Sequence, residues 1–210
     1  MIGIGPTDVR WTGALLVAGM VLFLTGAAFW RMRFQQRDLQ KVLFAVAGSQ
    51  GQWTWIHSWM IVGVVTTTTA VALLRDLLVI RGDRIFSTMA ATGYTLGAVL
   101  MLGTLTFGLT VVRWAADETK RTGAMPSWFP ALQRWGGTMY VVHMLLSYLA
   151  FIPLGISLLE TGLVAPWAAW STIGIGAISA IGFAALGGGP FAPPILAHVP
   201  TAAIGILLLI

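Results

Sequence analysis

The chain has 210 residues, of which 57% are hydrophobic and only 9% are charged. A soluble domain carries about 25% charged residues, and a fold this apolar could not cover its surface with polar atoms, so we expect lipid around most of it. The net charge of +5 does not indicate nucleic-acid binding, because the basic residues lie beside apolar spans. The absence of cysteine excludes disulfides, thiolate metal sites and cysteine nucleophiles.

The first residues, MIGIGPTDVRW, differ from a secretory signal peptide. They lack a basic start, the apolar run that follows is longer than a signal's hydrophobic region, and no small-residue cleavage site closes it. We therefore expect this segment to lead into a first helix that the mature protein retains.

Long apolar runs recur along the chain, and a membrane-spanning helix needs roughly 20 such residues. The expected spans are residues 11–30, 55–74, 85–112, 136–158, 163–186 and 195–210. The stretch GGGPFAPP, 187–194, separates the last two, because glycine and proline disfavour a helix interior. The sixth run rises only roughly 24 Å, so either it crosses a locally thinned bilayer or the natural chain continues beyond it.

Unbroken runs favour helices over a transmembrane barrel, whose strands would alternate over roughly ten residues. The sequence thus predicts one domain, 1–210: an all-α integral membrane bundle of about six transmembrane helices with short interfacial helices. The interfacial candidates are RMRFQQRDLQKVLFAVAG, 31–48, and the aromatic-rich PSWFPALQRW, 126–135. The first has apolar residues at helical spacing and a basic face suited to anionic headgroups, so both segments are expected to anchor the protein.

Lysine and arginine in short loops set the orientation of such a bundle. The loops after the first and third spans carry Arg31, Arg33, Arg37, Lys41, Arg113, Lys120, Arg121 and Arg134. The opposite face carries only Arg10, Arg75, Arg81 and Arg84. This bias predicts an inner (plasma) membrane protein with an external N-terminus and with the first and third loops in the cytoplasm.

Small residues at four-residue spacing predict close contacts between helices, because little hydrophobic drive joins helices in lipid. Gly93 and Gly97 have this spacing in the third span, and Gly176 and Ala180 have it in the fifth. The spacing leaves open whether the contact is internal or between subunits.

Four consecutive threonines, Thr66 to Thr69, lie in the middle of the second span and encircle it. Their hydroxyls either bond back to carbonyls of their own helix or line a polar pathway.

The three histidines, His57, His143 and His198, each lie one or two turns inside an even-numbered span. Those spans run in the same direction, so the sequence predicts all three near one face, roughly 6 to 11 Å inside their spans. An ionisable residue inside a membrane is a functional hypothesis by default.

Three interpretations of these histidines stay open. They are separate interfacial residues within an aromatic belt, as the segment WTWIHSWM at 53–60 suggests. They form a ligand cluster for a haem iron or a metal ion, where Met60 and Met144 would suit a soft ion such as Cu(I). Or they handle protons or solutes, although every Asp and Glu lies in a loop or at a span edge.

No hydrolase elbow, Walker loop or zinc-protease pair is present, and no lysine lies inside a span to form a retinal Schiff base. We therefore expect a protein that is not an enzyme.

Two segments resemble uncharacterised bacterial multi-pass membrane proteins. The segment TGLVAPWAAWSTIGIG, 161–176, is similar to the glycine-apolar turn, proline and paired tryptophans that lead into a late helix there. WTWIHSWM is similar to the entry of their second helix, while Pro166 lies directly against Trp167 where a residue often intervenes. The resemblance implies a fold of about six helices and carries no functional site.

The leading expectation is a non-enzymatic accessory or structural subunit that packs against other membrane proteins or itself, lipid or pigment. The first alternative is a haem- or metal-binding redox anchor that uses His57, His143 and His198. The second is a transporter of small solutes or protons, with Thr66 to Thr69 as polar elements and a helix kink at Pro200.

Overall fold

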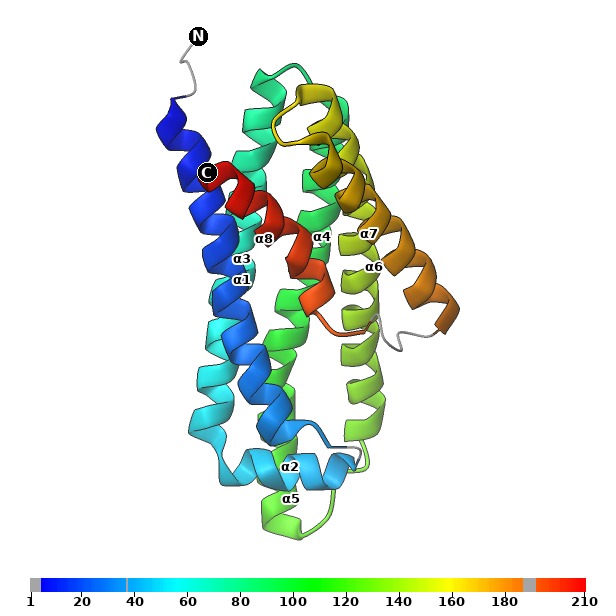
Figure 1. Cartoon of the computed structure of the whole chain (residues 1–210). Helices are drawn as coiled ribbons and strands as arrows, with labels where there is room; N and C mark the ends of the chain where they lie inside the picture. The colour runs from blue at the N-terminus through cyan, green and yellow to red at the C-terminus, as the bar shows by residue number, and fades with distance from the viewer. Residues whose placement is uncertain (1–4, 37, 187–191) are drawn as a thin grey trace.

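The computed structural model describes residues 5–36, 38–186 and 192–210, and every regular element within these ranges is a helix. In chain order the helices are α1 (Pro6–Phe34), α2 (Leu39–Gly48), α3 (Gln50–Ile80), α4 (Ile85–Phe107), the π-helical η1 (Gly108–Val112), α5 (Arg113–Thr122), α6 (Phe129–Thr161), α7 (Pro166–Leu186) and α8 (Ile195–Leu209). Helices α1, α3, α4 and α6 follow the long axis of a bundle, and α2 and α5 lie at one end of it (Figure 1).

Five of the described helices are long and apolar enough to cross a membrane: α1, α3, α4 continued through η1 and α5, α6, and α7. They make the chain a multi-pass membrane protein. The expected sixth span corresponds to α8, which has 15 residues. A helix of that length rises roughly 22 Å, less than the roughly 30 Å of a hydrocarbon core, and α8 begins part-way along the bundle (Figure 1).

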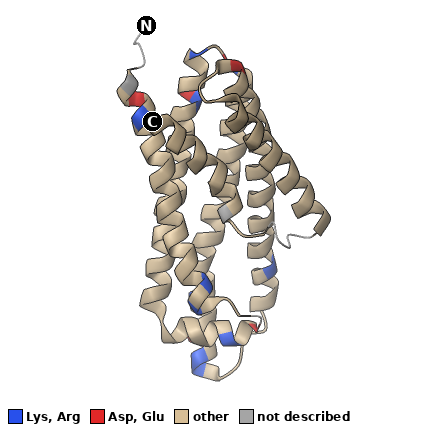
Figure 2. Ribbon diagram, in the orientation of Figure 1, with Lys and Arg blue, Asp and Glu red and all other residues tan. Residues whose placement is uncertain are grey.

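Charged residues gather at the two ends of the bundle, and the middle is free of them (Figure 2). This distribution matches a hydrocarbon layer around the middle, because a charge there would lack both water and a partner. Arg37 and residues 187–191, which entered the sequence predictions, lie outside the described residues.

The helices extend beyond the spans that hydropathy predicts. The third expected span, 85–112, is extended by α5 to Thr122, with the π-helical turn η1 inside the continuous helix. The expected interfacial segment 126–135 is largely the start of α6, which begins at Phe129 instead of near residue 136. Helices continue past the apolar core because a helical backbone satisfies its own hydrogen bonds in water as well as in lipid.

Helix α2 forms where an interfacial helix was expected, but protein and not lipid covers its apolar face. Leu43 and Val46 are fully buried, in a core cluster with Trp53, Ala115 and Phe129. The helix begins at Asp38, whose carboxylate accepts from two backbone N–H groups of the first turn. Helix α2 packs against α5, so the two form a cap at this end of the bundle (Figure 1).

Close helix contacts occur at the small residues singled out from the sequence. A Cβ added at Gly97 would lie 3.1 Å from the Ser147 hydroxyl, and one added at Gly176 would lie 2.8 Å from the Tyr148 carbonyl. Gly93 of α4 lies against Ala150 of α6. Ala180 of α7 is buried in the same core cluster as Tyr148 of α6. These contacts are internal, and they join α4 and α7 to α6.

The contact between α1 and α3 also depends on glycines, which the four-residue spacing rule did not single out. A Cβ at Gly63 would lie 2.6 Å from the backbone nitrogen of Phe23, and one at Gly26 would lie 2.7 Å from the Ile56 carbonyl. On α1 the contact glycines Gly19 and Gly26 are seven residues apart. That interval is typical of helices that cross at a small angle.

Three of the four threonines in the run Thr66 to Thr69 of α3 bond within their own helix. Thr67, Thr68 and Thr69 donate their hydroxyl protons to the carbonyls of Gly63, Val64 and Val65 at 2.8 to 3.0 Å. Such back-bonding is the usual solution for a hydroxyl on a helix without water.

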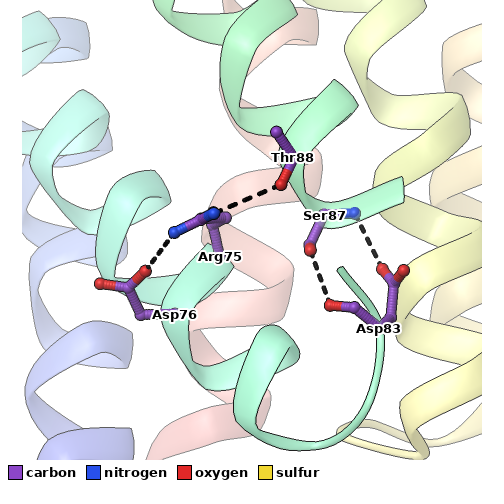
Figure 3. A network of polar contacts seen from close by, with 5 residues as sticks. All are labelled: Arg75, Asp76, Asp83, Ser87 and Thr88. Atoms are coloured by element: carbon purple, nitrogen blue, oxygen red, sulfur yellow. Dashed lines mark hydrogen bonds and ion pairs between the residues drawn. The ribbon is translucent and has the colours of Figure 1, made fainter. Parts of the chain in front are cut away.

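Asp83 organises the turn between α3 and α4, as Figure 3 shows. Its carboxylate accepts from the backbone N–H groups of Ile85, Phe86 and Ser87 at 2.8 to 3.1 Å. Burial alone would raise the pKa of this carboxyl, but the nearby Ser157 hydroxyl and the backbone donors outweigh it, so the pKa falls below its ordinary value of 3.8.

In the same turn Arg75 donates to Asp76 at 2.9 Å and to the Thr88 hydroxyl at 3.4 Å (Figure 3). This pair is exposed, and exposed ion pairs contribute little to stability. The capping carboxylate of Asp83 is therefore the main polar contact at this turn.

Gly63→Ala is expected to lower the melting temperature of the detergent-solubilised protein, because the new methyl group meets the α1 backbone at Phe23. Overpacking of this kind costs about 1–3 kcal/mol. Gly51→Ala is the control on the same helix, since a Cβ there has nothing within 4 Å, and it should be neutral or stabilising by up to about 1 kcal/mol. Equal effects of the two substitutions would contradict the packing argument.

Asp83→Ala is expected to destabilise the protein by about 1 kcal/mol through loss of the cap, whereas Asp76→Ala should change little. The lowered pKa of Asp83 in the folded state makes its contribution fully present above about pH 4 and lost as the pH falls through the folded-state value. The gap in melting temperature between wild type and Asp83→Ala should therefore stay constant from neutral pH to about pH 4 and close below it. A gap that widens in acid would refute this assignment.

Candidate functional site

All three histidines are buried, with 3 to 6% of their surface exposed, but they do not share one level. Their helices α3, α6 and α8 do run in the same direction (Figure 1). His143 meets α4 at Gly97 and His57 meets the continuation of that helix at Gly108, an interval of roughly 16 Å along a helix. His57 lies roughly two turns into α3, whereas His143 lies roughly four turns into α6 because that helix starts earlier than expected.

His57 is held by its own helix and by the π-helical turn. Its Nδ1 donates to the Trp53 carbonyl at 2.9 Å, and its ring packs on the Trp53 indole with centroids 4.2 Å apart. The indole N–H donates in turn to the Gly108 carbonyl at 2.8 Å. A Cβ at Gly108 would lie 2.5 Å from His57 Nε2, so a glycine is needed for the ring to approach.

The segment WTWIHSWM is thus divided between two environments. Trp53 and His57 point inward and fix α3 to η1, while Trp55 is 43% exposed and contacts Trp59 and Phe29 edge-on. π-Helical turns often occur at functional sites, but here the polar groups of Trp53 and Gly108 satisfy one another. His57 is therefore a packing residue in this arrangement.

His143 on α6 has one ring nitrogen satisfied and one free. Its Nδ1 lies 2.9 Å from the Gly97 carbonyl, and a carbonyl only accepts, so Nδ1 must carry the proton. In the neutral ring Nε2 then carries no proton and has a free lone pair. Within the described residues Nε2 is buried and has no hydrogen-bond partner.

His198 lies in the first turn or so of α8 and packs on Phe23 of α1, with ring centroids 4.3 Å apart. Its Nδ1 is also buried without a hydrogen-bond partner in the described part of the chain. Helix α8, which carries His198, contacts α6, which carries His143.

The start of α8 is fixed beside this part of α6. The Tyr140 hydroxyl donates to the Ala192 carbonyl just before α8, and Ala197 shares a core cluster with Met144. Pro200 interrupts the backbone hydrogen bonds of α8, and there the Thr201 hydroxyl donates to the His198 carbonyl at 2.8 Å. The position of His198 is thereby set by contacts on both sides of it.

The structure thus places His143 and His198 on two contacting helices, α6 and α8, and places His57 on α3 against η1. No group of three or more His, Asp or Glu residues that could hold a metal ion occurs among the described residues. The two methionines considered as soft ligands also separate, because Met60 packs in the cluster around Phe23 while Met144 lies in the cluster around Tyr148. What remains is a pair of imidazoles in an apolar interior, which offers nitrogen ligands and no charge.

No protein-family model matches the chain, and no curated protein and no solved structure is significantly similar to it. The functional argument therefore depends on the geometry of the site.

Proposed function

We propose that the protein is a non-enzymatic multi-pass membrane subunit that holds a metal centre between α6 and α8 through His143 and His198. The observation that carries this proposal is the pair of buried ring nitrogens, His143 Nε2 and His198 Nδ1, that have no partner among the described residues. A buried polar atom without a hydrogen bond costs about 1–3 kcal/mol, and a metal ion bound to both nitrogens would offset that cost.

The surroundings of His143 match those of a metal ligand. Metal-bound histidines almost always donate their other ring N–H to a carbonyl or carboxylate, which fixes the ring and raises its basicity. The Gly97 carbonyl accepts this bond from His143, and the Ser147 hydroxyl lies 3.4 Å from the same nitrogen. The ring is thus already oriented with its lone pair toward the interior.

Two protein nitrogens suit two kinds of centre. A haem iron takes its remaining ligands from the porphyrin and accepts an imidazole on each face. Cu(I) is soft, binds imidazole and is satisfied by few ligands. A tetrahedral zinc site needs three or four protein ligands, which the described residues do not assemble.

Purified protein, titrated separately with haem and with Cu(I), is expected to bind one of the two. Haem binding is measured by the Soret absorption, and Cu(I) binding is measured by competition with a Cu(I) chelator. His143→Ala and His198→Ala should each weaken binding by about tenfold or more, since each removes a ligand. His57→Ala is the matched control, because it removes a buried histidine outside the pair, and it should leave binding unchanged. Binding of neither ligand by the wild-type protein would refute the proposal, and so would an equal loss in His57→Ala.

A second candidate, association with other membrane proteins or with a second copy of the chain, is favoured by the outer face of α7. Trp167, Trp170, Ile178 and Ile181 on this face are 63 to 70% exposed. Helix α7 packs mainly on α6 and diverges from the rest of the bundle along its length (Figure 1). Such a face accepts lipid, pigment or another helix, so the metal centre and an accessory role are compatible.

We further propose that α8 is a sixth, partial span and that the protein lies in the plasma membrane with its N-terminus outside. The end of the bundle formed by α2 and α5 carries more lysine and arginine than the end with the α3–α4 turn (Figure 2). Short loops rich in these residues stay in the cytoplasm.

The cysteine-free sequence allows a direct test of orientation in bacterial cells. Arg84→Cys, at the α3–α4 turn, should react with a membrane-impermeant maleimide on intact cells. Lys120→Cys, in α5, should react only after the membrane is permeabilised. Both positions are exposed, so each variant is the control for the other, and the reverse pattern would overturn the proposed orientation.

A further inference from the structure

The end of the bundle opposite α2 contains an apolar cavity with two arginines at its edge. The cavity measures about 560 Å³ and lies between α1, α3 and α8. Its lining residues include two arginines, Arg10 and Arg81, and five apolar residues: Val9, Leu77, Ile80, Leu208 and Leu209. A second hollow of about 350 Å³ adjoins it, shares Arg10 and Leu209, and is lined by Trp11.

Among the described residues, neither arginine lies within ion-pair distance of a carboxylate. Within the described ranges the ion pair at this end joins Arg75 to Asp76. Asp8 accepts from the backbone N–H of Gly5 at 2.9 Å, and Asp83 accepts from three backbone N–H groups. These carboxylates bond to backbone N–H groups and not to Arg10 or Arg81, so the two guanidinium groups keep donors available beside the apolar walls.

We propose that this cavity binds an anionic phospholipid, with the phosphate between Arg10 and Arg81 and an acyl chain against Leu77 and Leu208. Guanidinium groups recognise phosphate through two parallel hydrogen bonds. Two guanidinium groups on separate segments can each bond different oxygens of one ligand. A phosphate has oxygens pointing in several directions and a carboxylate does not, so the arrangement favours a phosphate. The volume lies within the range of roughly 300–1,000 Å³ that is usual for ligand cavities.

The position in the bilayer fits the same ligand. Arg10 lies near the start of α1 and Arg81 directly follows the end of α3, so both flank apolar helices at the end of the bundle, as residues at the depth of lipid headgroups do. The proposal does not depend on the metal centre, because no residue of the cavity belongs to the histidine pair.

Trp11 provides a local reporter, since it is 63% exposed and lines the adjoining hollow beside Arg10. The protein is reconstituted in phosphatidylcholine vesicles that contain a minor fraction of brominated phosphatidylglycerol or of brominated phosphatidylcholine. Bromine quenches tryptophan at contact. The difference between wild type and Trp11→Phe isolates the Trp11 signal from the other nine tryptophans.

Brominated phosphatidylglycerol is expected to quench Trp11 at about tenfold lower mole fraction than brominated phosphatidylcholine. Arg10→Gln and Arg81→Gln should each reduce this preference. Arg84→Gln is the matched control, because it removes the same charge three residues further on at a position that does not line the cavity. It should leave the preference unchanged.

Equal quenching by the two lipids would overturn the proposal, as would an equal loss of preference in Arg81→Gln and Arg84→Gln. A preference that persists in Trp11→Phe would place the lipid elsewhere on the protein. A parallel titration with dibrominated stearate separates the two sources of an anionic headgroup. Stronger quenching of Trp11 by the fatty acid than by phosphatidylglycerol would overturn the phospholipid assignment.

Discussion

A polar atom in hydrocarbon has no water to bond, so each one must find its partner inside the protein. This constraint explains why the described chain is helical, and it also governs the side chains. The hydroxyls of Thr67 to Thr69 bond to their own helix, the Trp53 indole bonds to Gly108 across two helices, and Tyr140 bonds to Ala192 at the start of α8. Among the described residues four buried side-chain atoms lack such a partner, on Gln133, His143, Ser157 and His198. The two that could bind a metal ion are the ring nitrogens of His143 and His198, which is the reason a ligand is proposed there.

Close approach of helices is the second consequence of a lipid environment. Water does not drive these helices together, so contact depends on shape, and glycine removes the side chain that would hold two backbones apart. Gly63 lies against Phe23, Gly97 against α6, and Gly108 against the His57 ring. The same residue type therefore serves both the framework of the bundle and the placement of a histidine.

Much of the architecture could be predicted from hydropathy, since five of the expected spans correspond to five long apolar helices. Hydropathy locates the apolar stretch, however, and not the helix ends. Because α6 begins at Phe129, the depth predicted for His143 relative to His57 was wrong. The burial of α2 against α5 could not be predicted either, since an apolar helix face is the same whether lipid or protein covers it.

The candidate site was predictable only in residue type. Buried histidines in a membrane bundle indicate function, but the pairing of His143 with His198 depends on where α8 begins, which follows a segment rich in glycine and proline. The tautomer of His143 depends on a carbonyl of another helix. The contact glycines of α1 are seven residues apart, an interval that a search for four-residue spacing passes over.

Helix α8 packs chiefly on α1 and makes few contacts with its sequence neighbour α7. At this contact the two backbones approach closely, since a Cβ at Gly205 would lie 2.8 Å from the Gly13 carbonyl. The ribosome makes α1 well before α8, so the face of α1 around Gly13 is synthesised without this partner. The contact of α8 with α1, and with it the packing of His198 on Phe23, therefore forms only after α3 to α7 have been made.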